Sequence, residues 1–383
     1  MPEKNLTSDE LQRYSRHILM PEFGVEGQRR LKAASVVIIG AGGLGSPAAF
    51  YLAAAGIGRI GLVDFDVVGL TNLQRQILYS DNDLGKAKTS VAKDRLTAIN
   101  PHLVIEIHQT ELTSLNALEI LKNYDIILDA SDNFSTRYLV SDASVILKKP
   151  NVYGSIIKFD GQVGVFDSAR GPCYRCLFPS PPPANLVPNC SQAGVLGVLP
   201  GIIGTLQALE VIKLATGIGE ALIGRLVIFD GMKSVFNEIA ISKDPDCPSC
   251  GRRAPIHTLT SYENYCAPTS NSAESHSSAN FEISVDELEQ KLDRGDKLFL
   301  LDVREPEERE ICNIGGHLIP LVEISARLSE IDREAEVIVY CKSGGRSAVA
   351  VEILRNAGFN SVKNLTGGID AWAERIDQSL PRY

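Results

Sequence analysis

The sequence lacks three features that mark other classes of protein. It has no excess of positive charge: acidic residues outnumber basic ones, 47 to 38, and the net charge of −9 argues against nucleic acid as the main partner. Its first ten residues are polar and charged, unlike a signal peptide. Its long uncharged runs, residues 34–58 and 193–209, are interrupted by glycine and proline, so we expect buried core and no membrane span.

A disulfide framework is not expected either. The chain has 8 cysteines, and four of them form two Cys-x-x-Cys pairs, Cys173 with Cys176 and Cys247 with Cys250. In a chain with no export signal this pattern predicts a cytoplasmic protein with metal-binding or catalytic thiols. The expected partners are small molecules and other proteins.

The order of apolar segments predicts an α/β fold. Strands alternate with helices through the first third of the chain, which is typical of a mostly parallel, doubly wound sheet. The expected strands lie at residues 36–39, 60–64, 103–108 and 125–129, and the expected helices at 46–55 and 88–99. Shorter strands, expected at 162–166, 226–229 and 235–241, predict an antiparallel extension of that sheet.

Composition also divides the chain into domains. A length of 383 residues predicts two to three domains. Residues 252–279 are rich in Ser, Thr, Asn and Ala, and we expect a flexible linker there. The linker separates a first domain, residues 1–251, from a second and smaller α/β domain, residues 280–383. Within the first domain, the proline-rich residues 179–188 predict an irregular surface loop.

A glycine-rich turn predicts a nucleotide site in the first domain. Gly40-Ala-Gly-Gly43-Leu-Gly45 follows an expected strand and opens an expected helix, with the spacing G-x-G-x-x-G. Asp64 ends the next strand and can accept hydrogen bonds from ribose hydroxyls. Taken alone, this motif leaves an NAD-dependent oxidoreductase as the default alternative.

Polar residues further along the same domain indicate a triphosphate. Asn72, Arg75, Lys88 and Asp132 follow the glycine-rich turn. Arginine and lysine match the charge of phosphates, and a carboxylate can hold Mg²⁺. Hydride transfer needs no such cluster, so ATP with Mg²⁺ is favoured over a nicotinamide cofactor.

The two Cys-x-x-Cys pairs predict a metal site. Cys173, Cys176, Cys247 and Cys250 complete a tetrahedral Zn²⁺ site without an open position. We expect a structural role for this zinc, because four thiolates leave no room for a catalytic water.

Cys341 is the candidate nucleophile of the second domain. An apolar run ends at this cysteine and is followed by Lys-Ser-Gly-Gly and Arg346. Backbone N–H groups, a helix N-terminus and Arg346 would favour negative charge on the sulfur. Cysteine phosphatases place five residues between Cys and Arg, whereas four lie between Cys341 and Arg346. The smaller loop suits a single sulfur atom, so we predict a persulfide.

The first domain resembles a known family. Over about residues 8–250, six motifs follow one another in the order seen in the MoeB/ThiF adenylyltransferases, which are relatives of the ubiquitin-activating enzymes. The motifs are Arg-Tyr-Ser-Arg16-His-Ile, GAGGLG, DFD, NLQRQ, GKAK and DASDN. The resemblance implies a Rossmann-like mixed sheet of the ubiquitin-activating type and a homodimer, with Arg16 reaching ATP bound by the partner subunit. The implied ATP- and Mg²⁺-binding positions are Gly43, Asp64, Asn72, Arg75, Lys88 and Asp132, of which Arg75 and Asp132 support adenylation. Relatives also carry a reactive cysteine at the position of Cys190.

The second domain resembles the rhodanese family over residues 281–378. The resemblance rests on LDVREPEE, GGHLIP, the Cys341 loop and NLTGGIDAW. It implies a persulfide on Cys341. We expect Asp302 and Arg304 to hold the loop, and Glu305 and Glu308 to be solvated.

The fusion resembles the MoeZ-type adenylyltransferase/sulfurtransferases. It implies adenylation of the C-terminal Gly-Gly carboxylate of a ubiquitin-like sulfur-carrier protein, followed by sulfur transfer from Cys341, loaded by a donor such as a cysteine desulfurase. Cys190 would reduce the intermediate, and the product would serve molybdopterin, thiamine, cysteine or tRNA-thiolation pathways. Besides the oxidoreductase, an adenylating or conjugating scaffold with an inactive rhodanese-like domain stays open.

Overall fold

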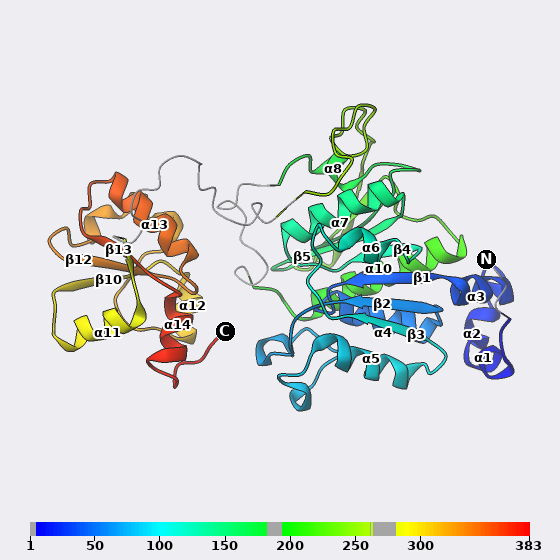
Figure 1. Ribbon diagram of the computed structural model, residues 1–383, viewed down its shortest axis with the longest axis horizontal. Coiled ribbons are helices and arrows are strands. Elements are labelled where there is room, and N and C mark those ends of the chain that lie inside the picture. Colours follow the sequence, from blue (N-terminus) through cyan, green and yellow to red (C-terminus); the bar gives the residue numbers. More distant parts are fainter. Residues whose placement is uncertain (1–4, 182–193, 261, 263–280) are drawn as a thin grey trace. The chain divides into compact units, whose positions relative to one another are not determined.

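The computed structural model describes residues 5–181, 194–260, 262 and 281–383 (Figure 1). The chain forms two compact units, Met1–Ser270 and Asn271–Tyr383. Cys190 lies outside the described residues, and so do residues 263–279 of the predicted linker.

The first unit is built on an eight-stranded sheet of order β3-β2-β1-β4-β5-β6-β7-β8. Its first five strands are parallel, and β6, β7 and β8 continue it with antiparallel pairing. The predicted mixed sheet is therefore confirmed. The strands are β1 Ser35–Ile39, β2 Arg59–Val63, β3 Val104–His108, β4 Ile126–Asp129, β5 Asn151–Ile157, β6 Asp160–Phe166, β7 Arg225–Asp230 and β8 Val235–Ala240.

Helices cover both faces of this sheet. All five residues of β1 are buried, and they alternate between two cores: Val36 and Ile38 in one, Val37 and Ile39 in the other. The first core includes residues of α4 Gly45–Ala55, α5 Lys88–Ile99 and α10 Val198–Thr216. The second includes residues of α6 Ala117–Leu121, α7 Phe134–Leu147 and α8 Tyr174–Leu177, and Figure 1 shows α6 and α7 across the strands from α4 and α5.

Helix α10 corrects one expectation. The glycines and proline of residues 193–209 were expected to break this run, yet α10 is continuous from Val198. Pro200 lies in its first turn, where a missing N–H costs little. A Cβ on Gly204 would collide with the Leu44 carbonyl, so this glycine allows close packing on the loop before α4. Among the described helices, α10 alone is long and apolar enough to cross a membrane, but it belongs to the core on the sheet.

The N-terminal residues form three short helices. These are α1 Ser8–Arg13, α2 Ser15–Ile18 and α3 Gly24–Ala33. Thr7 and Glu10 close α1 with a capping box. At the other end of the unit, the chain stays attached beyond residue 252. Tyr262 is 5% exposed, and its hydroxyl donates a 2.6 Å hydrogen bond to Asp142.

The second unit has a five-stranded parallel sheet of order β11-β10-β12-β13-β9. Val337 and Val339 face one core, and Ile338 and Tyr340 face the other. Its strands are β9 Glu282–Ile283, β10 Leu298–Asp302, β11 His317–Leu318, β12 Glu336–Tyr340 and β13 Val362–Leu365. Its α-helices are α11 Val285–Asp293, α12 Pro306–Ile311, α13 Gly345–Asn356 and α14 Gly368–Arg375.

Candidate functional site

The glycine-rich turn lies at the carboxyl end of the first sheet, where strand order reverses beside β1. Crevices at this position bind ligands in doubly wound folds. Gly40 has a φ of +92°, and a Cβ on it would lie 3.0 Å from the Ala130 carbonyl oxygen that follows β4. A Cβ on Gly43 would lie 3.2 Å from Pro200 and 3.5 Å from the side chain of Arg75. The turn is therefore tightly enclosed, and Arg75 lies beside it.

Asp64 links the end of β2 to this turn. Its carboxylate accepts 2.8 Å hydrogen bonds from the backbone N–H groups of Ala41 and Asp66. Burial raises the pKa of Asp64, while the Lys88 ammonium and the two N–H donors act in the opposite direction. Each carboxylate oxygen retains a lone pair, so Asp64 can still accept from a ribose hydroxyl.

Lys88 is an almost buried cation at the start of α5. Its side chain is 5% exposed, and Nζ lies 2.8 Å from Asp66 Oδ2, whose side chain is 51% exposed. A buried ammonium with an exposed counter-ion can exchange that partner for an anionic ligand at small cost in desolvation. This arrangement suits phosphate binding.

Asn72 ends η1, a 3-10 helix at Leu70–Asn72, and Arg75 lies just after it. Asn72 Oδ1 accepts a 3.1 Å bond from the Gly69 N–H, and Arg75 Nη1 donates a 2.9 Å bond to the Thr71 carbonyl. Backbone groups of the same segment therefore hold both side chains. The bond to Thr71 uses only one of the N–H donors of Arg75.

Sequence reasoning missed two neighbours of the turn. The Tyr79 hydroxyl donates a 2.8 Å bond to the Ala41 carbonyl. Gln76 is buried beside Gly42, and its Oε1 has no hydrogen-bond partner among the described residues. Gln76 belongs to the NLQRQ segment, so the motif carried this signal, whereas nothing local marked Tyr79.

Asp132 follows β4 at the same edge of the sheet, because Ile39 and Asp129 are register partners. The Asp132 side chain is exposed, while Asn133 caps α7 by accepting a 2.9 Å bond from the Thr136 N–H. Asp129 is fully buried; burial raises its pKa, and the bonds from Ser131 oppose the shift. Asp132 is thus the accessible carboxylate of this segment.

Arg16 is exposed on α2, and its predicted role toward a partner subunit stays a prediction.

The four cysteines of the first unit converge. Their Sγ atoms all lie within 4.8 Å of one another, with 3.5 Å between Cys173 and Cys247 and 3.4 Å between Cys176 and Cys250. Zn–S bonds of about 2.3 Å imply S···S separations of about 3.8 Å in a tetrahedral site. The Asp244 N–H also points at Cys176 Sγ, at 3.4 Å. The cluster can therefore hold a metal ion, and its all-sulfur donor set fits zinc.

A buried ion pair attaches this cluster to α7. Arg175, inside the first Cys-x-x-Cys pair, makes two hydrogen bonds to Asp142, at 2.8 and 2.9 Å, and both side chains are at most 5% exposed. The same carboxylate accepts from Tyr262, and Arg175 also donates to the Pro179 carbonyl. One arginine therefore ties the cysteines to the helix that follows Asp132.

In the second unit, Cys341 directly follows β12 and is 1% exposed. Its Sγ accepts a 3.2 Å hydrogen bond from the Gly344 N–H, and Ser347 Oγ lies 3.3 Å away. Gly344 has a φ of +98°, which turns its N–H toward the sulfur. The loop therefore directs a backbone N–H and a hydroxyl at the sulfur.

Arg346 corrects the expectation that Glu308 is solvated. Its two terminal nitrogens donate to both Glu308 oxygens, at 2.6 and 2.7 Å, and the Glu308 side chain is 13% exposed. Burial is the largest single influence and raises the pKa of Glu308, but the Arg346 guanidinium, the Glu305 N–H and the Tyr383 hydroxyl together outweigh it, so the net pKa is lowered. Glu308 of α12 therefore fixes the position of the Arg346 guanidinium. Glu305 is exposed, as expected.

Asp302 and Arg304 form a bidentate ion pair whose side chains are both fully buried. Asp302 is the register partner of Tyr340, directly before Cys341. Arg304 also donates a 2.9 Å bond to the Cys312 carbonyl, so the pair anchors the end of α12, and its role toward the Cys341 loop stays a prediction.

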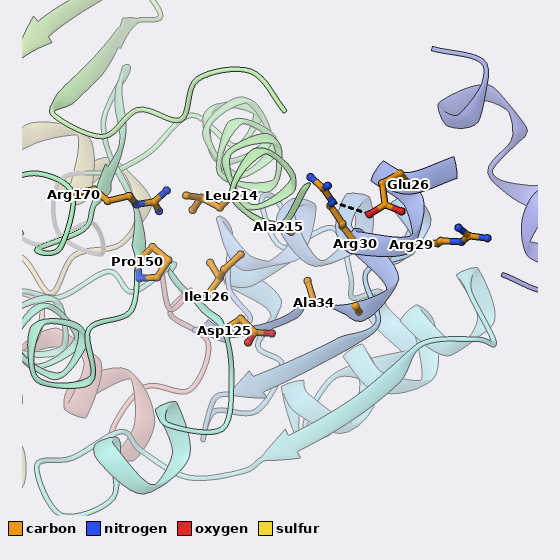
Figure 2. A pocket seen from close by; sticks show the side chains of 11 residues that line it. Glu26, Arg29, Arg30, Ala34, Asp125, Ile126, Pro150, Arg170, Leu214 and Ala215 are labelled. Atoms are coloured by element: carbon orange, nitrogen blue, oxygen red, sulfur yellow. Dashed lines mark hydrogen bonds and ion pairs between the residues drawn. The ribbon is translucent and has the colours of Figure 1, made fainter. Parts of the chain in front are cut away.

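A separate cavity of about 380 Å³ lies at the amino ends of strands of the first sheet, opposite the glycine-rich turn. Figure 2 shows Arg30 bonded to Glu26 at its rim, and Asp125 and Pro150 come just before β4 and β5. It contains none of the predicted site residues.

Comparison with known proteins identifies the families to which the two units are similar. Residues 14–249 match the ThiF family, and residues 284–375 match the rhodanese-like domain. The probable adenylyltransferase/sulfurtransferase MoeZ of Mycobacterium tuberculosis is 43% identical over 389 residues, covering 100% of this chain and 97% of that protein. The adenylyltransferase and sulfurtransferase MOCS3 of Drosophila yakuba is 45% identical over 391 residues, covering 99% of this chain and 86% of that protein.

Among solved structures, Escherichia coli MccB with ATP matches at a TM-score of 0.55 and 27% identity, covering 66% of this chain and 76% of that chain. These relatives support the expected ATP-binding fold and not the dehydrogenase alternative. The chain belongs to the ThiF family, as an adenylyltransferase that also carries a rhodanese-like sulfurtransferase domain.

Proposed function

We propose that this protein activates a ubiquitin-like sulfur-carrier protein at its C-terminal Gly-Gly carboxylate and then converts that carboxylate to a thiocarboxylate. One observation carries the proposal: a nucleotide-binding edge and a cysteine loop built for a sulfur anion occur on one chain. Each supplies a step that the other needs, since a carboxylate must be activated before sulfur can replace its oxygen.

The first step is adenylation. A carrier carboxylate oxygen attacks the α-phosphorus of ATP, pyrophosphate leaves, and an acyl-adenylate forms. Gly43, Asp64 and Asn72 position the nucleotide, and Arg75 and Lys88 stabilise the developing phosphate charge. Lys88 exchanges its ion pair with Asp66 for the phosphates. Asp132, the exposed carboxylate at this edge, would hold Mg²⁺, which offsets phosphate charge when bound. Arg16 would come from the second subunit of a homodimer.

The second step is sulfur transfer. Cys341, loaded as a persulfide by a donor such as a cysteine desulfurase, attacks the acyl carbon through its terminal sulfur, and AMP leaves. The product is an acyl disulfide. A second thiol, assigned to Cys190, attacks the sulfur of Cys341; the thiocarboxylate leaves, and a disulfide joins the two cysteines. A cellular thiol then reduces that disulfide, which suits a cytoplasmic location.

The carrier would bind the exposed antiparallel edge of the first unit. Every residue of β8 is exposed, and Val235, Phe236 and Ile239 are each at least 44% exposed. An apolar edge strand with unpaired backbone groups is a template for strand addition by a partner.

The four-cysteine cluster would hold structural Zn²⁺. Bound zinc would supply a rigid tetrahedral cross-link between the two Cys-x-x-Cys turns and no catalytic chemistry. Arg175 and Asp142 would transmit that rigidity to α7 and the Asp132 segment.

Pyrophosphate exchange tests the activation step. With a Gly-Gly-ended carrier, label from pyrophosphate should enter ATP, and removal of the two terminal glycines of the carrier should abolish the exchange. Mass spectrometry of the carrier, with ATP and a sulfur source added, should show one oxygen replaced by sulfur. A scaffold with an inactive rhodanese-like domain predicts exchange with an unmodified carrier, and that result would refute the proposal.

A further inference from the structure

Tyr383 lies against the cysteine loop, although it is 42 residues beyond Cys341 in the sequence. Its hydroxyl accepts a 2.9 Å hydrogen bond from Arg304 Nη1 and donates a 2.9 Å bond to Glu308 Oε1. Burial raises the pKa of Tyr383, so the hydroxyl stays protonated and remains a donor. Tyr383 therefore joins the buried Asp302–Arg304 pair to the carboxylate that holds Arg346.

The ring of Tyr383 makes a second contact with the same loop. Lys342, the residue directly after Cys341, places its ammonium 4.6 Å from the ring centroid. A cation over a tyrosine face is attracted by the ring quadrupole. Both cations of the loop, Lys342 and Arg346, thus depend on this tyrosine, one directly and one through Glu308.

We propose that Tyr383 is a positioning residue for sulfur transfer, which holds Lys342 and, through Glu308, Arg346 where they attract anions to Cys341. The inference deepens the proposed function and rests on it for its biological purpose. Its physical content is narrower: Tyr383 helps to fix two cationic side chains of the loop that contains Cys341, and an anionic reactant approaching that loop is attracted by them. Loss of the tyrosine would let the Lys342 ammonium move into solvent, where water screens its charge. It would also remove one of the bonds that fix Glu308 beside Arg346.

Alkylation of Cys341 measures this effect without any carrier or ATP. Iodoacetate is an anion and iodoacetamide is neutral, and both transfer their carbon to the thiolate as iodide leaves. Peptide mass spectrometry of the full chain gives the rate at Cys341 for each reagent. The ratio of the two rates reports local charge, because a general loosening of the loop would speed both reagents together.

Tyr383→Ala should lower the iodoacetate-to-iodoacetamide ratio by about threefold or more. Tyr383→Phe keeps the ring for Lys342 but loses both hydroxyl bonds, so its ratio should lie between those of the parent and the alanine variant. Arg382→Gln is the matched control, because Arg382 is exposed next to Tyr383 and pairs only weakly, at 4.0 Å, with Glu374. Its ratio should be unchanged.

The KM for thiosulfate gives an independent readout. Thiosulfate passes its outer sulfur to the Cys341 thiolate and leaves as sulfite, and cyanide then removes that sulfur as thiocyanate. Tyr383→Ala should raise the KM for this dianion by about threefold or more, with a smaller change in kcat. An unchanged ratio together with an unchanged KM in a folded Tyr383→Ala protein would overturn the inference. Loss of carrier sulfuration with both readouts intact would instead count against the proposed function.

Discussion

The four clustered cysteines and Cys341 show how environment separates two uses of the same thiol. In the first unit, four sulfurs face one another within 4.8 Å, and their nearest partners are other sulfurs. In the second, a single sulfur faces the Gly344 N–H and the Ser347 hydroxyl. The first arrangement can share a cation and has no room for a substrate. The second favours an anion on one reactive atom.

The largest effect is expected from a substitution that disables Cys341 alone. Cys341→Ser removes the sulfur that carries the persulfide, so sulfur transfer to the carrier should fall to background. Pyrophosphate exchange should remain within about twofold of the parent, because the adenylation residues lie in the other unit. Both rates can be measured on one preparation. Loss of both activities would mean that the two units do not divide the work in this way.

A complementary substitution disrupts the four-cysteine cluster and leaves Cys341 intact. Cys247→Ser removes one of four metal ligands, so the first unit should lose bound zinc and about 4 kcal/mol of stability. Elemental analysis and thermal melting measure these losses, and strong chelators should mimic the variant. Thiosulfate turnover at Cys341 should persist. A variant that keeps its melting temperature would contradict a structural metal here.

A buried ion pair gives the second unit its own structural weak point. Arg304→Ala leaves the fully buried Asp302 carboxylate unpaired and should cost about 3–5 kcal/mol. Chemical denaturation should show the rhodanese-like unit unfolding earlier, while pyrophosphate exchange survives. Arg294→Ala is a suitable control, because that arginine is 61% exposed and pairs with a partly exposed Asp296. Equal losses for the two variants would show that the pair contributes nothing beyond a surface contact.

Glu308 should make a smaller contribution to the stability of the second unit, and this contribution should depend on pH. Its pKa is lowered in the folded state, so it binds fewer protons there than in the unfolded chain. Its stabilisation is therefore fully present above the unfolded pKa, near 4.5, and is lost as pH falls through the folded value. Relative to Glu308→Gln, the parent should be more stable by about 1–2 kcal/mol at neutral pH, and the difference should shrink below pH 4.5. A difference independent of pH would rule out an ionised Glu308 as its source.

The smallest effect concerns a helix that carries no site residue. Ser284 caps α11 by accepting a 3.2 Å bond from the Glu287 N–H, within a capping box. Ser284→Ala should cost about 1 kcal/mol in denaturation of the second unit, with no change at Cys341. An altered rate of sulfur transfer would show that α11 is coupled to the loop.

The parts predicted correctly from sequence are those encoded by neighbouring residues. Gly40–Gly45 and Cys341–Arg346 are short segments in which each residue acts on the next few, so their spacing reveals a turn and a loop. The strand pattern up to Asp129 is likewise local, and the parallel sheet followed from it.

The missed features are pairings between distant positions. Arg346 bonds to Glu308, which is 38 residues away in the sequence, and Glu308 bonds to Tyr383, which is 75 residues away. Asp142 and Tyr262, which also bond to each other, are 120 residues apart. Nothing in the neighbourhood of Glu308 distinguishes it from the solvated Glu305, because only the folded sheet brings α12 beside α13. Helix α10 was misjudged for a related reason: its glycines serve close packing on a distant loop and not a local turn.

The central claim is that the adenylate made by the first unit is consumed by Cys341 of the second. Peptide mass spectrometry of Cys190→Ser protein, incubated with a Gly-Gly-ended carrier, ATP and a sulfur donor, tests it directly. The account predicts an acyl disulfide that joins the carrier's last glycine to Cys341 through two sulfur atoms, formed only with ATP. Absence of that adduct while pyrophosphate exchange proceeds, or its formation without ATP, would contradict the account.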